Sequence, residues 1–565
     1  MNAPAPAESW DVIVLGGGLA GLCCALQLRQ ANPQSRMLVL DRRRGDSPAG
    51  VHTVGESTVE VAAHYFSEVL GLGEHLRTQQ LRKFGFRFFN LDGREDIDGV
   101  QEIGVSRYLN VTSFQIDRGL FENYLRERAR ALGVEVREGC TVGEIAMASG
   151  AHRGAPAHSV HCQSPQGPQD LQARWVIDAS GRSGVLKRQL GLAQPSPHDA
   201  HAVWFRMPCR IDIEAWSSDP EWLGRCEHAQ RWLSTNHLVG QGYWVWLIPL
   251  ASGYHSIGIV ADPALHPPGQ FSHYAGALAW LEVHQPRLAR ALRECGQQPG
   301  DYVAMRQFAH GCREVFSGDR WAITGDAGVF LDPFYSPGSD FIAIANTYIA
   351  DLVTRDLHGE PWAPFVGLYG QLFRSFYEST LQLYVGQYSL FGHPQALATK
   401  VIWDYTYYWG VLCQLFFQGR LTDVPALGRS REPLGRARAL NEAMQPWLRR
   451  WAATVPADNR AVLLDQAGLP WFDALNRSLV DTLDDAGFRA RILASLARMQ
   501  ELAAEIVGRA LAQLPGCRDW PETRALLQAA GREATPGGTL LAYPQSPSSA
   551  ARPPHAPTPA SRRHA

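Results

Sequence analysis

Hydrophobic residues near the start of the chain form two short runs, separated by a glycine-rich turn and a helical stretch. Residues 11–15, DVIVL, are apolar and β-branched and lead directly into the glycine-rich segment 16–21. A helical pattern through Leu22, Leu26 and Leu28 follows, and a second apolar run, MLVLD, ends at Asp41. This order of strand, glycine turn, helix and strand with a terminal acid predicts a nucleotide-binding β–α–β unit.

The glycines and the terminal acid of this unit are the residues expected to contact a nucleotide. Gly16, Gly18 and Gly21 allow a tight turn and let backbone N–H groups meet a pyrophosphate at the start of the helix. Asp41, about twenty residues on, suits hydrogen bonding to the ribose of an adenosine. The alternative is a glycine turn with a purely structural role, but the flanking strands and helix favour nucleotide binding.

Two later segments each have the character of a strand that enters a glycine turn. They are residues 174–184, RWVIDASGRSG, and residues 320–328, RWAITGDAG. Asp326 in the second segment stands where a helix N-terminus can gather the polar end of a cofactor. Its alternative role is that of an ordinary N-cap.

The remaining pattern divides the chain further. Residues 200–262 are rich in β-type patterns, and after about residue 355 the chain turns helical and very aromatic. These aromatic helices form either the core of a helical lobe or the lining of an apolar site or docking surface. From about residue 536 the sequence is rich in Pro, Ser and Ala and predicts a disordered tail.

Chain length, net charge and cysteine spacing limit the classes of function that this protein can have. A chain of 565 residues has room for two to four domains of about 150 residues each. It has 53 Lys plus Arg and 55 Asp plus Glu, a net charge of −2, which argues against a protein that coats nucleic acid. The ten cysteines include no C-x-x-C pair and no Cys/His cluster with zinc spacing, so no metal site is expected.

Targeting signals are not evident in the sequence. The first residues lack the basic start of a signal peptide, and no run of about 18 apolar residues occurs. We therefore expect a soluble, reduced and cytoplasmic protein without a transmembrane segment.

Lysine is rare in this chain. Of its 53 basic residues only Lys83, Lys187 and Lys400 are lysines, a bias that reflects base composition. Lys187 and Lys400 lie in segments without a motif and are expected at the surface. Lys83 lies in LRKFGFRFF, and its alternatives are a reactive amine or a surface lysine at the start of a strand.

A tryptophan motif then points to a family. Residues 242–249 read GYWVWLIP, so Trp244 and Trp246 fall on one face of a strand. With the nucleotide fingerprint, this segment resembles the G-W-x-W-x-I-P marker of flavin-dependent halogenases in the tryptophan-halogenase superfamily, closest to the pyrrole and phenol branches. The resemblance implies that Trp244 and Trp246 screen the flavin from a large organic substrate. The alternative is a paired-tryptophan sheet core.

Further roles follow from this resemblance, which covers residues 11 to about 350. Lys83 follows the VGEST segment at 54–58, as the reactive lysine of the family does. An amine can donate to hypohalous acid or be halogenated by it, whereas a guanidinium does not readily lose its proton. Arg118 resembles an arginine that approaches FAD; its alternative role is a salt bridge at a helix start.

The segment LDPFYSPGSDF at 331–341 resembles the family stretch that holds the halide beside the flavin. The candidate halide-binding residues are Ser336, Gly338 and Ser339. Tyr335 stands where tryptophan halogenases carry a glutamate, which fits the phenol and pyrrole branches better. Pro337 replaces a residue whose backbone N–H helps to bind the halide, and proline has no N–H to give.

The resemblance implies an α/β fold of the flavin monooxygenase type. It has a Rossmann-like FAD-binding domain, an inserted β-rich substrate domain and a C-terminal helical lobe. The expected divisions are a discontinuous FAD-binding domain at 1–95, 115–195 and 300–355, a substrate domain at 96–114 and 196–299, a helical region at 356–535 and a disordered tail at 536–565.

The implied function is that of an FAD-dependent halogenase. FAD reduced by a separate NAD(P)H-dependent flavin reductase forms a hydroperoxide with oxygen, and halide converts it to hypohalous acid that Lys83 presents to a phenol or pyrrole. The substrate is either free or attached to a carrier protein. Two alternatives remain: a non-halogenating FAD-dependent monooxygenase or oxidoreductase, favoured by Pro337, and a non-catalytic flavin-binding partner in a biosynthetic assembly.

Overall fold

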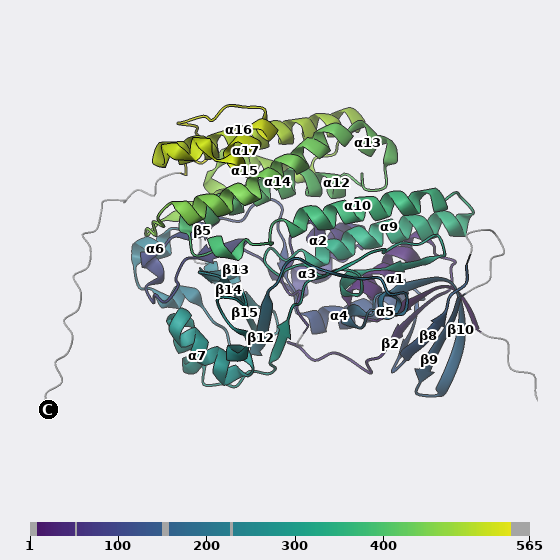
Figure 1. Ribbon diagram of the computed structural model, residues 1–565. Helices are drawn as coiled ribbons and strands as arrows, with labels where there is room; N and C mark the ends of the chain where they lie inside the picture. Colours follow the sequence, from purple (N-terminus) through teal and green to yellow (C-terminus); the bar gives the residue numbers. More distant parts are fainter. Residues whose placement is uncertain (1–7, 51–52, 150–157, 227–229, 544–565) are drawn as a thin grey trace, which may run out of the picture.

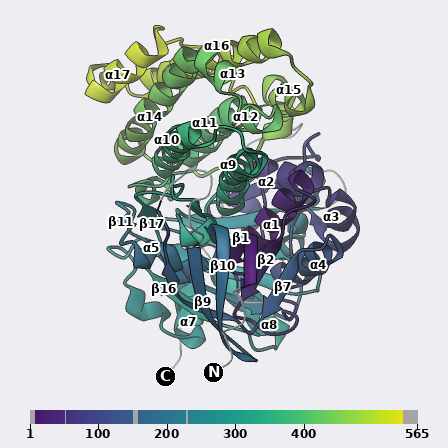
Figure 2. The same ribbon diagram turned by 90° about the vertical axis from the view of Figure 1, so that its right-hand side faces the viewer.

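In the computed structural model, two β-sheets lie below a layer of helices from the C-terminal part of the chain (Figure 1). The structure describes residues 8–50, 53–149, 158–226 and 230–543. The view turned by 90° shows the same helices above the first sheet (Figure 2). This mixed α/β architecture confirms the predicted fold class.

The first sheet contains the β–α–β unit expected from the sequence. Its order is β7-β2-β1-β10-β9-β8, and β18 also pairs with β10. β7, β2, β1, β10 and β18 are parallel, whereas β9 and β8 add antiparallel strands at one edge. The strands are β1 (Glu8–Leu15), β2 (Met37–Asp41), β7 (Glu135–Glu138), β8 (Thr141–Ala146), β9 (His158–Ser164), β10 (Gly167–Asp178) and β18 (Trp321–Ile323).

The second sheet is mostly antiparallel and has the order β16-β12-β15-β14-β13-β4-β5-β19. Its strands are β4 (Phe86–Phe89), β5 (Glu102–Gly104), β12 (His201–Met207), β13 (Thr235–Gly240), β14 (Tyr243–Pro249), β15 (His255–Ala261), β16 (Val303–Arg306) and β19 (Leu463–Asp465). The sheet thus takes β4 and β16 from segments that we assigned to the FAD-binding domain, and β19 from the helical region. Two smaller pairs are β3 (Leu81–Arg82) with β6 (Phe114–Gln115) and β11 (Ala193–Pro195) with β17 (His310–Cys312).

Helices surround the sheets and build the lobe. Those around the sheets are α1 (Leu19–Ala31), α2 (Glu60–His64), α3 (Gly73–Gln79), α4 (Arg118–Ala131), α5 (Val185–Gln189), α6 (Pro220–Gly224), α7 (Tyr274–His284), α8 (Pro286–Cys295) and α9 (Gly338–His358). The later ones are α10 (Ala363–Leu381), α11 (Pro394–Tyr407), the π-helix η10 (Tyr408–Cys413), α12 (Gln414–Phe417), α13 (Val424–Arg429), α14 (Arg431–Thr454), α15 (Pro470–Arg477), α16 (Asp485–Gln513) and α17 (Pro521–Ala530).

The aromatic residues of this lobe serve both roles that the sequence left open. Trp403 and Trp447 are fully buried within the helical layer and form part of its core. Tyr405 and Trp409 pack against each other with ring centroids 4.7 Å apart and also line a small cavity beside Lys83. The lobe is therefore a packed body that also contributes side chains to a cavity with mostly apolar and aromatic walls.

The expectation that Lys187 and Lys400 lie at the surface is wrong. Lys400 is fully buried in α11, where its ammonium group is 2.7 Å from the Asp404 carboxylate and donates to the Gln445 amide oxygen. Lys187 is 8% exposed, and its Nζ donates to the backbone carbonyl of Gly328. Asp404 is the i+4 neighbour of Lys400 on α11, whereas Gln445 and Gly328 come from segments far along the chain, and the contacts with those two are not evident from a single sequence.

The buried Lys400–Asp404 ion pair allows us to predict how substitutions at these residues change the free energy of unfolding. We expect Lys400→Met to lower the free energy of unfolding by about 3–5 kcal/mol, because it leaves the buried Asp404 carboxylate without its cation. The double variant Lys400→Met/Asp404→Leu should recover much of this loss. Urea denaturation of the three proteins measures the difference, and an unchanged midpoint in the single variant would contradict the prediction.

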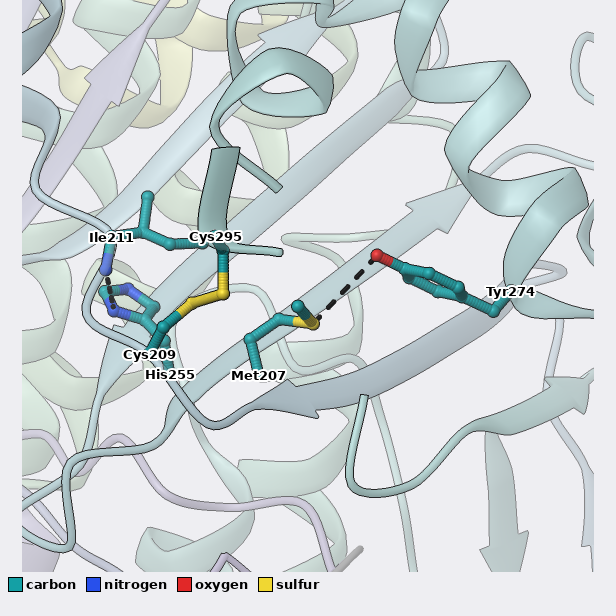
Figure 3. The surroundings of a disulfide bond; sticks show 6 residues. All are labelled: Met207, Cys209, Ile211, His255, Tyr274 and Cys295. Atoms are coloured by element: carbon teal, nitrogen blue, oxygen red, sulfur yellow. Dashed lines mark hydrogen bonds between the residues drawn. A yellow bond between two sulfur atoms is a disulfide. The ribbon is translucent and has the colours of Figure 1, made fainter. Parts of the chain in front are cut away.

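One pair of cysteines is oxidised, so the expectation of a fully reduced chain is wrong. Cys209, just after β12, and Cys295, at the end of α8, form a disulfide with their Cα atoms 6.5 Å apart (Figure 3). In the same region, the backbone N–H of Ile211 donates to His255 Nδ1. The bond joins the second sheet to the helical pair α7–α8, a pairing that spans 86 residues of sequence.

The start of the expected disordered tail is packed against α16. The backbone amides of Leu540 and Leu541 donate to the Glu505 carboxylate, and the Trp471 indole donates to the carbonyl of Leu540. Residues 536–543 are thus held by hydrogen bonds. The rest of the predicted tail, 544–565, lies outside the described residues.

Two searches of the described residues bear on membrane and metal binding. No helix in the described ranges has the length and apolar character needed to cross a membrane. Within the same ranges, no three His, Cys, Asp or Glu side chains gather in an arrangement that could hold a metal ion.

Candidate active site

A cavity of about 650 Å³ is lined by residues from both sheets and from the start of α9. It brings together ten of the residues singled out in the sequence: Gly16, Gly18, Asp41, Arg118, Trp244, Trp246, Asp326, Ser336, Gly338 and Ser339. Gly21 and Lys83 do not line it. Gly21 packs against Gly16, and Lys83 donates a hydrogen bond to Ser57; Gly16 and Ser57 both line the cavity.

The turn between β1 and α1 is shaped for close backbone approach. Gly16 has φ +111°, and a Cβ there would lie 2.4 Å from the carbonyl oxygen of Ala179. Gly18 is the N-cap of α1, and a Cβ there would meet only the Glu122 carboxylate, at 3.9 Å. The Leu19 N–H at the helix start donates to Glu122 Oε1 at 3.3 Å, while Gly16, Gly17 and Gly18 line the cavity at the positive end of the helix, where an anionic pyrophosphate would bind.

Gly21 has a packing role. It lies in the first turn of α1, and a Cβ there would lie 2.0 Å from the carbonyl oxygen of Gly16. The helix can therefore sit this close to the end of β1 only because residue 21 is glycine. Gly21 sets the position of the N–H groups without touching the cavity itself.

Two buried polar groups at this end of the cavity have an atom without a hydrogen bond in the described structure, which a bound cofactor would supply. Asp41 is 8% exposed, and its Oδ2 forms ion pairs with Arg43 at 3.6 Å and Arg126 at 3.7 Å but accepts no hydrogen bond. Arg118 donates to Glu122 in an i, i+4 ion pair, but its Nε has no partner among the same residues. Both the salt bridge and the cofactor role predicted for Arg118 are therefore compatible with its position. These groups fit an adenosine and a pyrophosphate.

Asp326 also lines this cavity. It lies inside the 3₁₀ turn η8 (Gly325–Ala327), which follows β18, so it is not an N-cap residue. Burial raises the pKa of Asp326, and the nearby Arg182 opposes that rise. A polar part of a cofactor would meet this carboxyl at the end of the parallel strands, the usual ligand-binding edge of such sheets.

The two tryptophans form a wall from the second sheet. Trp244 and Trp246 lie on one face of β14 with ring centroids 5.6 Å apart. The Trp244 indole donates to Tyr388 Oη at 3.0 Å, and the Trp246 indole donates to Ser256 Oγ at 3.1 Å. Gly258 on β15 makes room for Trp246, since a Cβ there would lie 2.2 Å from the ring. Their orientation is therefore fixed.

The segment before α9 forms a strained turn against the cavity. Tyr335 and Ser336 have φ of +64° and +52°, a conformation that costs non-glycine residues about 1–3 kcal/mol. Pro337 precedes α9 as its N-cap, and the described structure offers no side-chain cap for this helix. Ser336, Gly338 and Ser339 line the cavity beside the positive end of the helix dipole.

Lys83 is buried, not exposed at a strand start. It is 2% exposed, and its Nζ donates to Ser57 Oγ at 2.9 Å and to the carbonyl oxygen of Thr58 at 2.8 Å. Ser57 lines the large cavity, whereas Lys83 lines a second, small cavity behind it. Burial lowers the pKa of Lys83 to about 7, while the carboxylates of Glu60 and Asp340 oppose this shift.

Comparison with known proteins agrees with this geometry. Residues 9–249 match the FAD binding domain family model. The flavin-dependent halogenase chlA of Dictyostelium discoideum is 26% identical over 61% of this chain and 60% of its own length. The 1H-pyrrole-2-carbonyl-[peptidyl-carrier protein] chlorinase of Pseudomonas fluorescens is 25% identical over 61% of this chain and 75% of its own. Residues 9–249 are thus similar to an FAD binding domain, and the chain is similar to proteins named as flavin-dependent halogenases.

The solved structures support the same fold. Halogenase PltM aligns with a TM-score of 0.60 and 19% sequence identity, covering 91% of this chain and 98% of PltM. This FAD binding domain therefore sits within a larger shared architecture that includes the helical lobe. The chain spans only 60% of the length of its Dictyostelium relative.

Several cavity residues escaped the sequence reasoning. His237 on β13 lines the large cavity and stacks on Phe88, and burial lowers its pKa to about 3, so it is neutral. Asp332 also lines the cavity and accepts hydrogen bonds from Tyr388 and contacts His198. His237 comes from a segment without a local motif. Asp332 and Ser57 did have a signal, because they lie in the quoted segments 331–341 and 54–58.

Proposed function

We propose that this protein is an FAD-dependent halogenase that places chloride or bromide on an electron-rich aromatic compound. The observation that carries the proposal is one cavity that joins the nucleotide turn, the tryptophan wall and the start of α9, with Lys83 one hydrogen bond behind it. The relatives named as flavin-dependent halogenases and as a pyrrole chlorinase support this chemistry.

FAD is the cofactor for which this cavity has matching groups. Gly16, Gly18, Asp41, Arg118 and Asp326 would hold it. Reduced FAD, which we propose a separate NAD(P)H-dependent flavin reductase to supply, provides with oxygen the oxidising power that makes halide electrophilic. The protein itself binds and orients the cofactor and excludes water from the space beside it.

The start of α9 is the proposed halide site. The backbone N–H groups of Gly338 and Ser339 and the hydroxyl of Ser336 would donate to the anion, with support from the helix dipole. Pro337 contributes no N–H, so the site depends on these neighbours. Trp244 and Trp246 close the cavity on the second-sheet side and keep a bulky aromatic away from the halide.

Lys83 is the proposed proton donor at the halogenating end. Its ammonium group would donate to hypohalous acid and protonate the departing hydroxide, so that water leaves as the halogen bonds to the ring carbon. The neutral Lys83 amine would then take up the proton that the same ring carbon loses, which restores the ammonium group and the aromatic ring. Ser57 and Thr58 hold the Nζ in place through two hydrogen bonds. The aromatic substrate is a phenol or a pyrrole, free or attached to a carrier protein.

A turnover experiment tests this function. The FAD-loaded protein, a flavin reductase, NADH and oxygen are incubated with chloride or bromide and a panel of phenols and pyrroles. We expect a product whose mass increases by one halogen and which is absent without halide. Hydroxylation or desaturation that does not depend on halide would instead support a monooxygenase, the alternative that Pro337 favours. Bound FAD without any oxygen-dependent turnover would support a non-catalytic role.

The charge of Lys83 predicts a pH dependence. With a pKa of about 7, Lys83 is an ammonium group below that pH and a neutral amine above it. If the ammonium form donates the proton, kcat/KM should fall as pH rises through about 7. Burial also raises the pKa of Asp340 to about 7, so both groups titrate in this range.

The Asp340→Asn variant separates the two titrations. Removing this negative charge lowers the pKa of Lys83, so the fall in kcat/KM should move to lower pH. Rate profiles from pH 5.5 to 9 on both proteins provide the measurement. A profile that is flat in wild type, or unmoved in the variant, would contradict proton donation by Lys83.

A further inference from the structure

A chain of hydrogen bonds runs from the tryptophan wall into the helical lobe. The Trp244 indole donates to Tyr388 Oη at 3.0 Å, and this hydroxyl donates to Asp332 Oδ2 at 2.5 Å. His198 Nε2 lies 2.6 Å from the same carboxylate oxygen. Tyr388 begins the 3₁₀ turn η9 (Tyr388–Leu390) of the lobe, whereas Trp244 and Asp332 line the flavin cavity. One tyrosine of the lobe therefore connects two parts of the cavity wall.

The direction of each bond in this chain is set by the atoms that form it. An indole N–H can only donate and a carboxylate can only accept, so the Tyr388 hydroxyl must accept from Trp244 and donate to Asp332. Burial and the Asp332 charge raise the pKa of Tyr388 well above its ordinary value, so the hydroxyl keeps the proton that it donates. Trp244, Tyr388 and Asp332 are 1%, 3% and 1% exposed, which keeps bulk water away from these bonds.

Asp332 also holds the turn that precedes α9. Its Oδ1 accepts the backbone N–H of Phe334 at 2.8 Å, directly before Tyr335 and Ser336, the two residues of this turn with positive φ. The Phe334 ring packs edge-on against Trp244 with ring centroids 5.1 Å apart. The carboxylate therefore fixes the turn of the proposed halide site and, through the tyrosine hydroxyl, the indole beside it.

Ring packing alone does not fix the Trp244 indole. The ring contacts those of Trp246, His237 and Phe334, and such apolar contacts have little directional preference. The bond to Tyr388 is the only hydrogen bond that its N–H makes among the described residues. Because a buried N–H without an acceptor is costly, this bond selects one orientation of the indole.

The backbone around Tyr388 is held on the second sheet independently of the hydroxyl. Gly242, in the turn between β13 and β14, donates its N–H to the Tyr388 carbonyl oxygen at 3.2 Å. Asn90, directly after β4, donates its Nδ2 to the carbonyl oxygen of Phe391 at 3.1 Å. Tyr388→Phe should therefore keep the ring and the backbone in place and remove only the hydroxyl.

We propose that Tyr388 and Asp332 are positioning residues that hold Trp244 in the orientation that keeps water away from the flavin. The inference rests on the proposed function, because it gives the tryptophan wall a part in halogenation. It also brings a residue of the helical lobe, outside the segment 11–350 that resembles a known family, into the active site. Without the hydroxyl, the relative population of turned indole orientations should rise about tenfold.

A turned indole would open the wall and change the products of the reaction. With water beside the flavin, reduced FAD and oxygen give oxidised FAD and hydrogen peroxide, since two electrons and two protons pass from the flavin to oxygen and halide takes no part. Each molecule of peroxide released this way is one molecule of halogenated product lost. The amount of product formed per reduced flavin therefore reports how well the wall is closed.

The orientation of Trp244 can be measured without turnover. The 17 tryptophans are replaced by 5-fluorotryptophan, and ¹⁹F NMR spectra of the oxidised, FAD-loaded protein are recorded. The Trp244 signal is the one missing from Trp244→Phe. We expect Tyr388→Phe to shift or broaden this signal. Asp332→Asn, which replaces an acceptor oxygen by an amide donor, should do the same and keeps the test valid if Tyr388→Phe does not retain FAD.

Tyr384→Phe is the matched control. Tyr384 is fully buried four residues before Tyr388, and the two rings lie 6.1 Å and 5.5 Å from the His198 ring. The Tyr384 hydroxyl has no hydrogen-bond partner among the described residues, so the same substitution leaves the chain intact. The Trp244 signal should stay as in wild type. An equal change in both variants would reflect general repacking and would overturn the positioning role.

A double-mutant cycle tests whether Tyr388 acts through Trp244. The FAD-loaded protein is reduced without oxygen and mixed with oxygenated buffer, bromide and a phenol, and brominated product and peroxide are counted per flavin. Tyr388→Phe should lower the product severalfold and raise peroxide, with unchanged FAD content. Added to Trp244→Phe, it should have no further effect, because phenylalanine has no N–H to position. Losses that multiply in the double variant would overturn the inference.

The two measurements separate this inference from the proposed function. An unmoved Trp244 signal and unchanged product per flavin in Tyr388→Phe would overturn the positioning role and leave the halogenase function intact. A Trp244 signal that moves in Tyr388→Phe but not in Tyr384→Phe, in a protein that never halogenates, would support the positioning of Trp244 and reject the halogenase function.

Discussion

Replacing Lys83 with alanine should remove halogenated product while FAD remains bound. The Lys83 ammonium group lies between the two cavities, where it donates to Ser57 Oγ and to the carbonyl oxygen of Thr58. General acid catalysis of this kind contributes about 10²- to 10⁴-fold to the rate. The loss should be of that order in kcat, with no change in flavin absorbance because Lys83 does not line the FAD cavity.

Lys83→Arg sharpens this test. Arginine keeps the positive charge, but its guanidinium is larger than the ammonium group and does not release a proton near neutral pH. We therefore expect Lys83→Arg to be nearly as inactive as Lys83→Ala. The matched control is Lys187→Arg, the same substitution at a buried lysine that lines neither cavity. Full activity of Lys83→Ala would reject the role assigned to this lysine.

Gly21→Ala should abolish FAD binding through packing alone. The new Cβ would lie 2.0 Å from the carbonyl oxygen of Gly16 and 3.1 Å from Ala179 Cβ. Because α1 cannot keep its place against β1, the start of the helix would move away from the pyrophosphate position. Overpacking of this kind costs about 1–3 kcal/mol or more. Flavin content after purification and the urea midpoint of the apoprotein measure the two effects.

The same substitution at Gly370 should stabilise the protein. Gly370 lies inside α10, and a Cβ there would meet no atom within 4 Å in the described structure. Gly370→Ala should retain FAD and raise the free energy of unfolding by about 0.5–1 kcal/mol, because alanine is the better helix former. If Gly21→Ala kept its FAD as well, close packing of α1 would not be what positions the cofactor.

The FAD-binding part of the fold was predictable from sequence because its signals are local. The run from β1 to Asp41 contains strand, turn, helix and acid within one short stretch, and the structure has each of them. The tryptophan marker is equally local, since Trp244 and Trp246 are two residues apart on one strand. Ten of the twelve candidate residues named from the sequence therefore line the large cavity.

The parts that escaped prediction depend on contacts between distant segments. Trp409 and Gln466 line a cavity together with Glu60 and Lys83 although more than 300 residues of sequence separate the two pairs, and none of Glu60, Trp409 and Gln466 lies in a quoted motif. The Cys209–Cys295 bond likewise joins segments without a shared signal. The i, i+4 spacing of Lys400 and Asp404 is visible in the sequence, but the burial of this face of α11, where Lys400 also donates to Gln445, depends on packing between distant segments.

The burial of all three lysines has a practical consequence for chemical labelling. Lys83, Lys187 and Lys400 are 2%, 8% and 0% exposed, so the folded surface offers amine-reactive reagents no lysine side chain. Acylation, biotinylation or amine cross-linking at a lysine would then require a local opening of the structure. The modification rate of Lys83, followed by peptide mass spectrometry, therefore reports how often the wall around its ammonium group opens.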